Sequence, residues 1–160
     1  MAPLPEFYKI NVDGAIAGEG NLSCVGVVIR DCRGLVVAAC SKVLNGAFAA
    51  EVTEALAVEE GVRLAKELEL SQVIIEFDSV MVVEAICSGN CNGELGSLVQ
   101  GSLELLRYFK SWKVKHLKRV YNTTAHDLAQ AAKAFGISQL WRGFEPPIVQ
   151  RALLVDRAKC

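Results

Sequence analysis

The order of strand-like and helix-like stretches is the feature that most constrains how this chain can fold. Residues 7–15 alternate apolar and polar side chains, which predicts a strand with one apolar face. Residues 24–31 and 35–43 are β-rich runs joined by an Asp-Cys-Arg-Gly turn signal, which predicts a hairpin. The rest alternates between the two patterns, with helices expected over about 47–68, 79–89, 95–109 and 122–135 and strands over 71–78 and 112–120. This order predicts an α/β domain with a five-stranded mixed sheet, antiparallel in its first three strands and then parallel, flanked by helices.

The length of the chain suits one domain. Its 160 residues, 52% of them hydrophobic, can bury a substantial core. We expect the domain to span residues 7–136, and residues 137–160 to form a C-terminal tail that packs on it or extends from it. No stretch reaches the roughly 18–20 consecutive apolar residues that a membrane-spanning helix needs, and the N-terminus does not resemble a secretory signal. We therefore expect a monomer without a membrane partner, located in the nucleus or cytoplasm, with its six cysteines reduced.

Charge is distributed unevenly along the chain, although its net value is only −1. Residues 51–104 contain eleven acidic and two basic residues, whereas residues 107–133 contain seven basic residues and one acidic residue. This asymmetry suggests that an acidic region and a basic region serve different ends of one ligand. An ordinary solvated surface is an equally good interpretation of the charge alone.

Three acidic residues stand where an ionised carboxylate needs a partner. Asp13 ends the first strand, and Asp78 ends the apolar run of the fourth with no basic residue near it in sequence. With successive helical residues about 100° apart, Glu54 falls at the centre of the core-facing arc, whereas Glu59 and Glu60 fall on the solvated side. If strands one and four are parallel neighbours, their carboxyl ends bring Asp13 and Asp78 together, with Glu54 above them.

Such a cluster favours a hard divalent cation. Without a neutralising charge, three carboxylates would repel and raise one another's pKa. Ligation by oxygen alone favours Mg²⁺ or Mn²⁺ over zinc. The alternative is that each acid separately serves as a turn or helix-capping residue.

Five blocks of the sequence together resemble a known family. They are KINVDGA (9–15), GVVIRDCRGLVVAACS (26–41), TEALAVEEGVRLAKELEL (53–70), VIIEFDSVMVVEAI (73–86) and KRVYNTTAHDLAQAA (118–132), and the tail WRGFEPPIVQRALLVD (141–156) is also similar. In order and spacing they resemble the ribonuclease H fold, specifically the plant reverse-transcriptase-like branch associated with non-LTR retroelements. The resemblance covers about residues 7–156, and its acids are the three already identified.

This resemblance implies hydrolysis of the RNA strand of RNA–DNA hybrids with Mg²⁺ as the cofactor. In that scheme two metal ions lie on either side of the scissile phosphate, where one activates the attacking water and the other stabilises the leaving oxygen. Asp13 would bridge both metals, and Glu54 and Asp78 would each bind one. The expected partner is nucleic acid, either an RNA–DNA hybrid or a structured RNA.

The resemblance also implies substrate contacts. Gly14 and Ala15 would let the backbone approach the RNA strand closely. Ser79 could donate to a phosphate, although capping the following helix is an equally good interpretation. Asn122 is a further expected substrate contact. The 2′-hydroxyls in the wide minor groove would distinguish RNA from DNA.

The last block departs from the family pattern. The classical ribonucleases H have a fourth acid in an Asn…Ala-Asp-x-Leu-Ala pattern, but NTTAHDLA places His126 there, followed by Asp127, and a histidine with this spacing is usual in the plant branch that the chain resembles. Both are catalytic candidates. His126 is either a residue at the edge of the site or part of a capping turn, and Asp127 could complete a capping box that begins at Thr124. The basic handle of some family members is absent, and the run from Lys110 to Arg119 is expected to replace it in part through phosphate contacts.

Three functions are compatible with these features. An Mg²⁺-dependent endoribonuclease is supported by the intact set of Asp13, Glu54 and Asp78. A catalytically weak or inactive nucleic-acid-binding module is favoured by His126, the negative net charge and the missing handle. A protein-interaction domain with vestigial acids is a lesser alternative. They differ in whether a hybrid is cleaved, bound without cleavage or not bound.

Overall fold

The structure, a computed structural model, describes residues 6–18, 21–89 and 93–143. The alternation in β1 (Tyr8–Ala15) places Ile10 and Val12 against α1 (Ala50–Glu67), where both lie close to Gly61. Asn11 and Asp13 therefore face the other side of the sheet. Neighbouring residues of β1 therefore face different helices on the two sides of the sheet.

Six strands form one sheet in the order β5-β4-β1-β2-β3-β6. The remaining strands are β2 (Cys24–Arg30), β3 (Val36–Val43), β4 (Gln72–Phe77), β5 (Ser111–His116) and β6 (Gln139–Arg142). β1, β2 and β3 pair antiparallel, and β4 and β5 pair parallel beside β1. The predicted mixed sheet is confirmed, with one more strand than the five expected.

The additional strand, β6, lies in the segment that we expected to be a tail. After α4, Gly136 takes a left-handed conformation with φ 66°, and the chain returns to pair antiparallel with the edge of β3. With only four residues, of which three are exposed, β6 has no alternating pattern that predicts a strand. Residues 144–160 of the expected tail lie outside the described part of the chain.

The helices follow the predicted order with shifted ends. They are α1, α2 (Val80–Ser88), α3 (Gly93–Leu106) and α4 (Thr123–Phe135), with a short 3₁₀ helix, η1 (Arg119–Tyr121). The strand predicted over 112–120 ends at His116, because Leu117 N–H donates to Phe77 O and the chain then turns into η1. No helix among the described residues has the length and apolar character needed to cross a bilayer.

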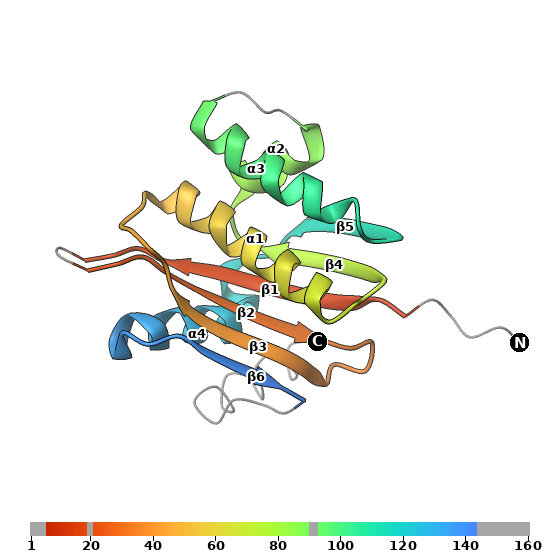
Figure 1. Cartoon of the computed structure of the whole chain (residues 1–160), viewed down its shortest axis with the longest axis horizontal. Coiled ribbons are helices and arrows are strands. Elements are labelled where there is room, and N and C mark those ends of the chain that lie inside the picture. The colour runs from red at the N-terminus through yellow and green to blue at the C-terminus, as the bar shows by residue number, and fades with distance from the viewer. Residues whose placement is uncertain (1–5, 19–20, 90–92, 144–160) are drawn as a thin grey trace, which may run out of the picture.

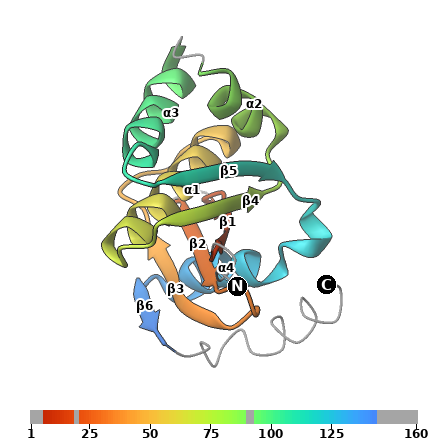
Figure 2. The same ribbon diagram turned by 90° about the vertical axis from the view of Figure 1, so that its right-hand side faces the viewer.

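The helices α1 and α4 cover opposite faces of the sheet (Figures 1 and 2). On one face, apolar residues of α1 pack over β1, β2 and β4, and α3 packs outside α1. On the other face, Leu128 of α4 packs with Val28, Val36 and Ala39. The strand β1 thus lies between α1 and α4.

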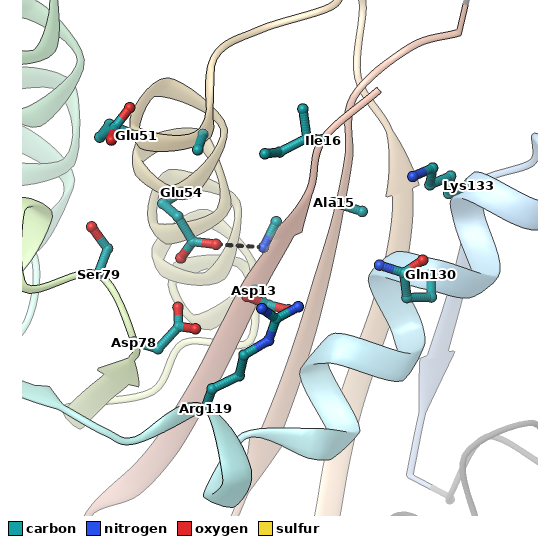
Figure 3. Close-up of a pocket in the computed structure, with 12 residues that line it drawn as sticks. Asp13, Ala15, Ile16, Glu51, Glu54, Asp78, Ser79, Arg119, Gln130 and Lys133 are labelled. Carbon is teal, nitrogen blue, oxygen red and sulfur yellow. Dashed lines mark hydrogen bonds between the residues drawn. The ribbon is translucent and has the colours of Figure 1, made fainter. Parts of the chain in front are cut away.

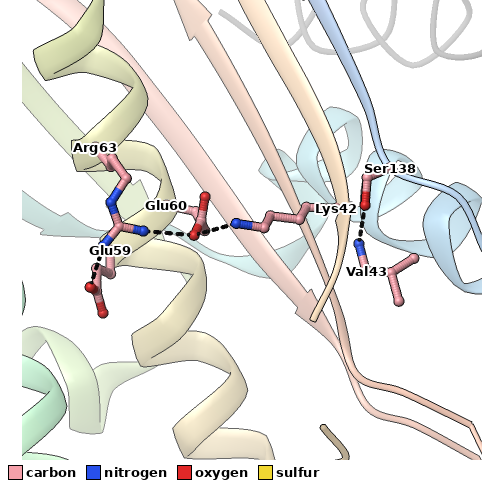
Figure 4. Close-up of polar contacts among 6 residues, drawn as sticks. All are labelled: Lys42, Val43, Glu59, Glu60, Arg63 and Ser138. Atoms are coloured by element: carbon pink, nitrogen blue, oxygen red, sulfur yellow. Dashed lines mark hydrogen bonds and ion pairs between the residues drawn. The ribbon is translucent and has the colours of Figure 1, made fainter. Parts of the chain in front are cut away.

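Ion pairs connect α1 to β3 (Figure 4). Lys42 Nζ lies 2.8 Å from Glu60 Oε1. The two terminal guanidinium nitrogens of Arg63 lie 2.9 Å from Glu60 Oε1 and 2.7 Å from Glu59 Oε1. Glu59 and Glu60 occupy the helix side that their spacing assigned to solvent. Because the pairs are partly exposed, each contributes at most about 1 kcal/mol to stability. Next to Lys42, Val43 N–H donates to the Ser138 hydroxyl at 2.9 Å, which attaches the segment leading to β6.

Candidate active site

Three carboxylates meet where β1 and β4 end (Figure 3). Asp13 lies in β1, Asp78 follows β4, and Glu54 projects from α1. One ligand atom from each lies within 4.8 Å of the others. The parallel pairing of β1 with β4 explains this, because both strands end at the same edge while α1 crosses above them. The predicted convergence of the three side chains is confirmed.

Gly14 holds Glu54 beside this edge. The Gly14 N–H donates to Glu54 Oε1 at 2.9 Å. A Cβ at Gly14 would lie 2.7 Å from Thr53 Cγ2 and 3.2 Å from Glu54 Oε1, so a glycine lets α1 approach β1 this closely. Gly14 therefore has a structural role in addition to the approach of nucleic acid that the resemblance implies.

The cluster holds more negative charge than its surroundings neutralise. Burial, and then the neighbouring Asp13 carboxylate, raise the pKa of Glu54 well above its ordinary value. The same two causes, in the same order, raise the pKa of Asp78, and the Arg119 guanidinium opposes them in part. Glu54 Oε2 is buried, and no hydrogen-bond donor of the described residues faces it. This all-oxygen donor set fits a hard divalent cation.

His126 reaches the cluster from the other face of the sheet. Its Nδ1 lies 2.9 Å from Asp13 Oδ2. Gly26, which pairs with Asp13, makes this possible: a Cβ there would overlap Ala125 O and lie 2.6 Å from Ala129 N of α4. His126 is therefore at the edge of the site rather than in a capping turn.

Asn122 and Thr124 both make contacts within the protein near the start of α4. Asn122 is 2% exposed, and its Nδ2 donates to Val12 O at 2.8 Å, so it attaches the start of α4 to β1. Thr124 lies inside α4 and accepts from Arg30 at 3.0 Å, and Arg30 also donates to Asn11. Thr124 therefore does not cap the helix, and the predicted capping box is wrong.

The other predicted residues lie in different surroundings. Ser79 caps α2 by accepting from Val82 N–H at 3.3 Å, and it also lines the cavity beside the carboxylates. Ala15 is buried and lines the same cavity. Asp127 is exposed on α4 and belongs to neither the carboxylate cluster nor the described lining of the cavity.

The carboxylates open onto a cavity of about 360 Å³. Gln130 and Lys133 from α4 line the side of the cavity away from the carboxylates, and Arg119 from η1 reaches toward Asp13 (Figure 3). The sequence did not single out Gln130 or Lys133. Their spacing from His126, four and seven residues on one helix, is the signal that could have identified them. The cavity thus has one acidic and one basic wall.

Residues 11–132 match the family described as reverse transcriptase-like. The chain belongs to the reverse transcriptase-like family. The matched range contains all three clustered carboxylates and His126, so the described site lies within the part of this reverse transcriptase-like domain that defines its family.

A similar relative comes from Arabidopsis thaliana. This domain is 31% identical over 152 residues to an Arabidopsis thaliana protein that carries the provisional name of a ribonuclease H protein. The match covers 91% of this chain and 23% of that protein. The chain therefore spans about a quarter of the length of the relative.

Solved structures share the fold. Ribonuclease H1 from the halophilic archaeon Halobacterium salinarum has a TM-score of 0.74 and 22% identity, over 82% of this chain and 99% of that one. A ribonuclease H1 isolated from compost, solved in complex with an RNA/DNA hybrid, has a TM-score of 0.70 and 20% identity, over 81% and 98%. The reverse transcriptase-like domain thus has a ribonuclease H-like fold.

Glu54→Gln should raise the melting temperature of the metal-free domain at pH 8. The carboxyl has a raised pKa in the folded state, so its ionisation opposes folding at this pH. Glutamine keeps an oxygen for the Gly14 N–H and has no charge to desolvate. We expect a gain of roughly 1 kcal/mol, seen as about 2–4 °C in thermal melting. The exposed Glu104→Gln serves as the control, and a lower melting temperature for Glu54→Gln alone would contradict this electrostatic assignment.

Proposed function

We propose that this domain hydrolyses the RNA strand of RNA–DNA hybrids in a reaction that requires a divalent metal ion. The observation that supports this most directly is the cluster of Asp13, Glu54 and Asp78, whose ligand atoms lie within 4.8 Å of one another. The complex of the compost enzyme with an RNA/DNA hybrid supports the substrate class. The proposal concerns this domain, whatever the activity of a longer protein that contains it.

Mg²⁺ is the ion that we propose, with Mn²⁺ as a substitute. Asp13, Glu54 and Asp78 would hold it, since their oxygens match the preference of hard cations and Arg119 offsets their negative charge only in part. Bound there, the metal would activate the attacking water and stabilise negative charge on the leaving oxygen.

The domain's own groups would orient these carboxylates before the substrate binds. The Gly14 N–H fixes Oε1 of Glu54, which leaves Oε2 available to a cation. His126 fixes Oδ2 of Asp13 from the side of α4. In place of a fourth acid, His126 would thus position Asp13 without adding to the negative charge of the site.

We also propose two substrate contacts, an oligomeric state and a cellular location. Ser79 and Ala15 line the cavity and would be close to the substrate backbone. The domain would act as a monomer, in the nucleus or cytoplasm.

Incubation of a labelled hybrid with and without Mg²⁺ tests the function. The wild type should cleave the RNA strand only with the metal, and Asp78→Asn should remove this activity because one cluster ligand loses its charge. Cleavage that survives Asp78→Asn would point to a contaminant or another site. Hybrid binding without any cleavage would instead indicate an inactive binding module.

Magnesium should stabilise the domain more strongly as the pH rises from about 5 to 8. An acid whose folded pKa is raised binds protons more tightly in the native state, so without metal its contribution to stability falls as the pH rises above its ordinary value, 4.5 for Glu54. A cation binds the ionised form, so its stabilising effect grows over the same interval. Melting temperatures with and without Mg²⁺ check this, and a difference that does not vary with pH would contradict it.

A further inference from the structure

The helix α4 presents a polar ridge along the cavity. His126, Gln130 and Lys133 are separated by four and three residues, which places them on one side of the helix. His126 contacts Asp13, and the other two line the cavity (Figure 3). The ridge therefore begins at the carboxylates and leads away from them.

Two cations that line the cavity have no ion pair among the described residues. Lys133 is exposed on α4, and Arg119 is exposed in η1. Both line the cavity, yet neither forms a hydrogen bond or salt bridge with a side chain of the described part of the chain. By contrast, Lys9, Lys42 and Arg63 are paired with acids. Lys133 is thus available to an anion, whereas the charge of Arg119 also acts on Asp78.

The length of the ridge limits which anion suits it. From His126 to Lys133 the helix rises about 10 Å, at roughly 1.5 Å per residue. Neighbouring nucleotides of one strand are about 3.4 Å apart along a duplex axis, so this length corresponds to about three nucleotide steps. A single polyanionic strand could therefore have one phosphate at the carboxylates and another at Lys133.

We propose that Lys133, with Gln130 beside it, binds the sugar–phosphate backbone of the strand that is cut, about three nucleotides from the carboxylates. This inference rests on the proposed function and adds to it the direction in which the strand crosses the domain. Lys133 is a positioning residue: it contacts backbone rather than bases, so it orients substrates of any sequence.

Lys133 also lies in the last turn of α4, where a cation complements the helix dipole. Lys66 has the same position in α1, is exposed, and lies over the Tyr108 ring away from the cavity. Lys66→Gln is therefore a matched control for Lys133→Gln. Both substitutions remove one exposed charge from a helix end, but only the second removes it from the cavity.

Fluorescence anisotropy with a labelled hybrid, in EDTA so that no cleavage occurs, measures the contact. Lys133→Gln should weaken binding roughly five- to tenfold near 0.1 M salt and reduce the slope of log K against log salt by about one. Lys133→Arg should retain binding, and Lys66→Gln should behave as the wild type. With Mg²⁺, Lys133→Gln should raise KM and leave kcat within about twofold, a change that loss of stability alone does not cause.

The outcomes separate this inference from the proposed function. If Lys133→Gln and Lys66→Gln have equal effects, or Lys133→Gln binds as the wild type, the inference is wrong even if the domain cleaves hybrid. If binding depends on Lys133 but no condition gives cleavage, the inference holds and the nuclease proposal fails. A wild type that does not bind hybrid overturns both.

Discussion

Asp13→Asn should reduce Mg²⁺-dependent cleavage of an RNA–DNA hybrid by about a thousandfold or more. Asp13 is 4% exposed, and its charge raises the pKa of both Glu54 and Asp78. It therefore interacts electrostatically with each of the other two acids. It also accepts the contact from His126. Asparagine has nearly the same shape but no charge, so it should remove affinity for the cation while it preserves the packing of β1 against α4.

Thermal melting distinguishes this effect from misfolding. The metal-free variant should melt at or above the wild-type temperature, because one of three repelling charges is gone, and Mg²⁺ should no longer raise its midpoint. Glu84→Gln, an exposed acid on α2, should keep both the activity and the response to Mg²⁺. Wild-type cleavage by Asp13→Asn would place the chemistry outside the carboxylate cluster.

Gly26→Ala should destabilise the domain by about 3 kcal/mol or more, which corresponds to a fall in melting temperature of roughly 6–12 °C. A Cβ at Gly26 would overlap Ala125 O and lie 2.6 Å from Ala129 N and 2.8 Å from Leu128 Cβ. Two of these three atoms belong to the α4 backbone, which cannot rotate away as a flexible side chain could. The helix must therefore shift as a unit, and its packing on β2 must be lost in part.

Gly18→Ala is the matched control. Among the residues that the structure describes, its added Cβ would come near only Asn21 Nδ2, at 3.6 Å, so its melting temperature should stay near that of the wild type. Because Gly26 pairs with Asp13, a shift of α4 should also separate His126 from Asp13. In variants that remain folded, we expect slower cleavage at saturating Mg²⁺. A Gly26→Ala domain with wild-type melting and activity would show that α4 tolerates displacement at this point.

Local patterns contain enough information to predict the type and order of most elements. Alternation in residues 7–15 and 71–78 reflects one buried face of a strand, and the helical arc around Glu54 reflects one buried face of α1. Because a helical crossover makes neighbouring strands parallel, the order of elements also predicts that β1 and β4 end together. The cluster of Asp13, Glu54 and Asp78 follows from these rules.

Contacts between distant segments are not visible in such patterns. Asn122 matches a family motif, but whether its amide faces substrate or Val12 O depends on how α4 lies on β1, 110 residues away in sequence. β6 exists because β3 offers an open edge, and its own four residues have too weak a pattern to predict it. In the same way, Lys133 and Arg119 are two basic residues among seven until the fold places both of them in the lining of the cavity.

The sequence alone therefore determines the fold class, the antiparallel and parallel directions of the first five strands and the three acids, because periodicity and strand direction are local properties with simple geometric consequences. The tertiary packing decides how closely α4 approaches the sheet over Gly26, that His126 touches Asp13, and that the cavity has a basic wall. These features depend on contacts between residues that are far apart in the sequence. The local pattern of a single segment does not predict such contacts.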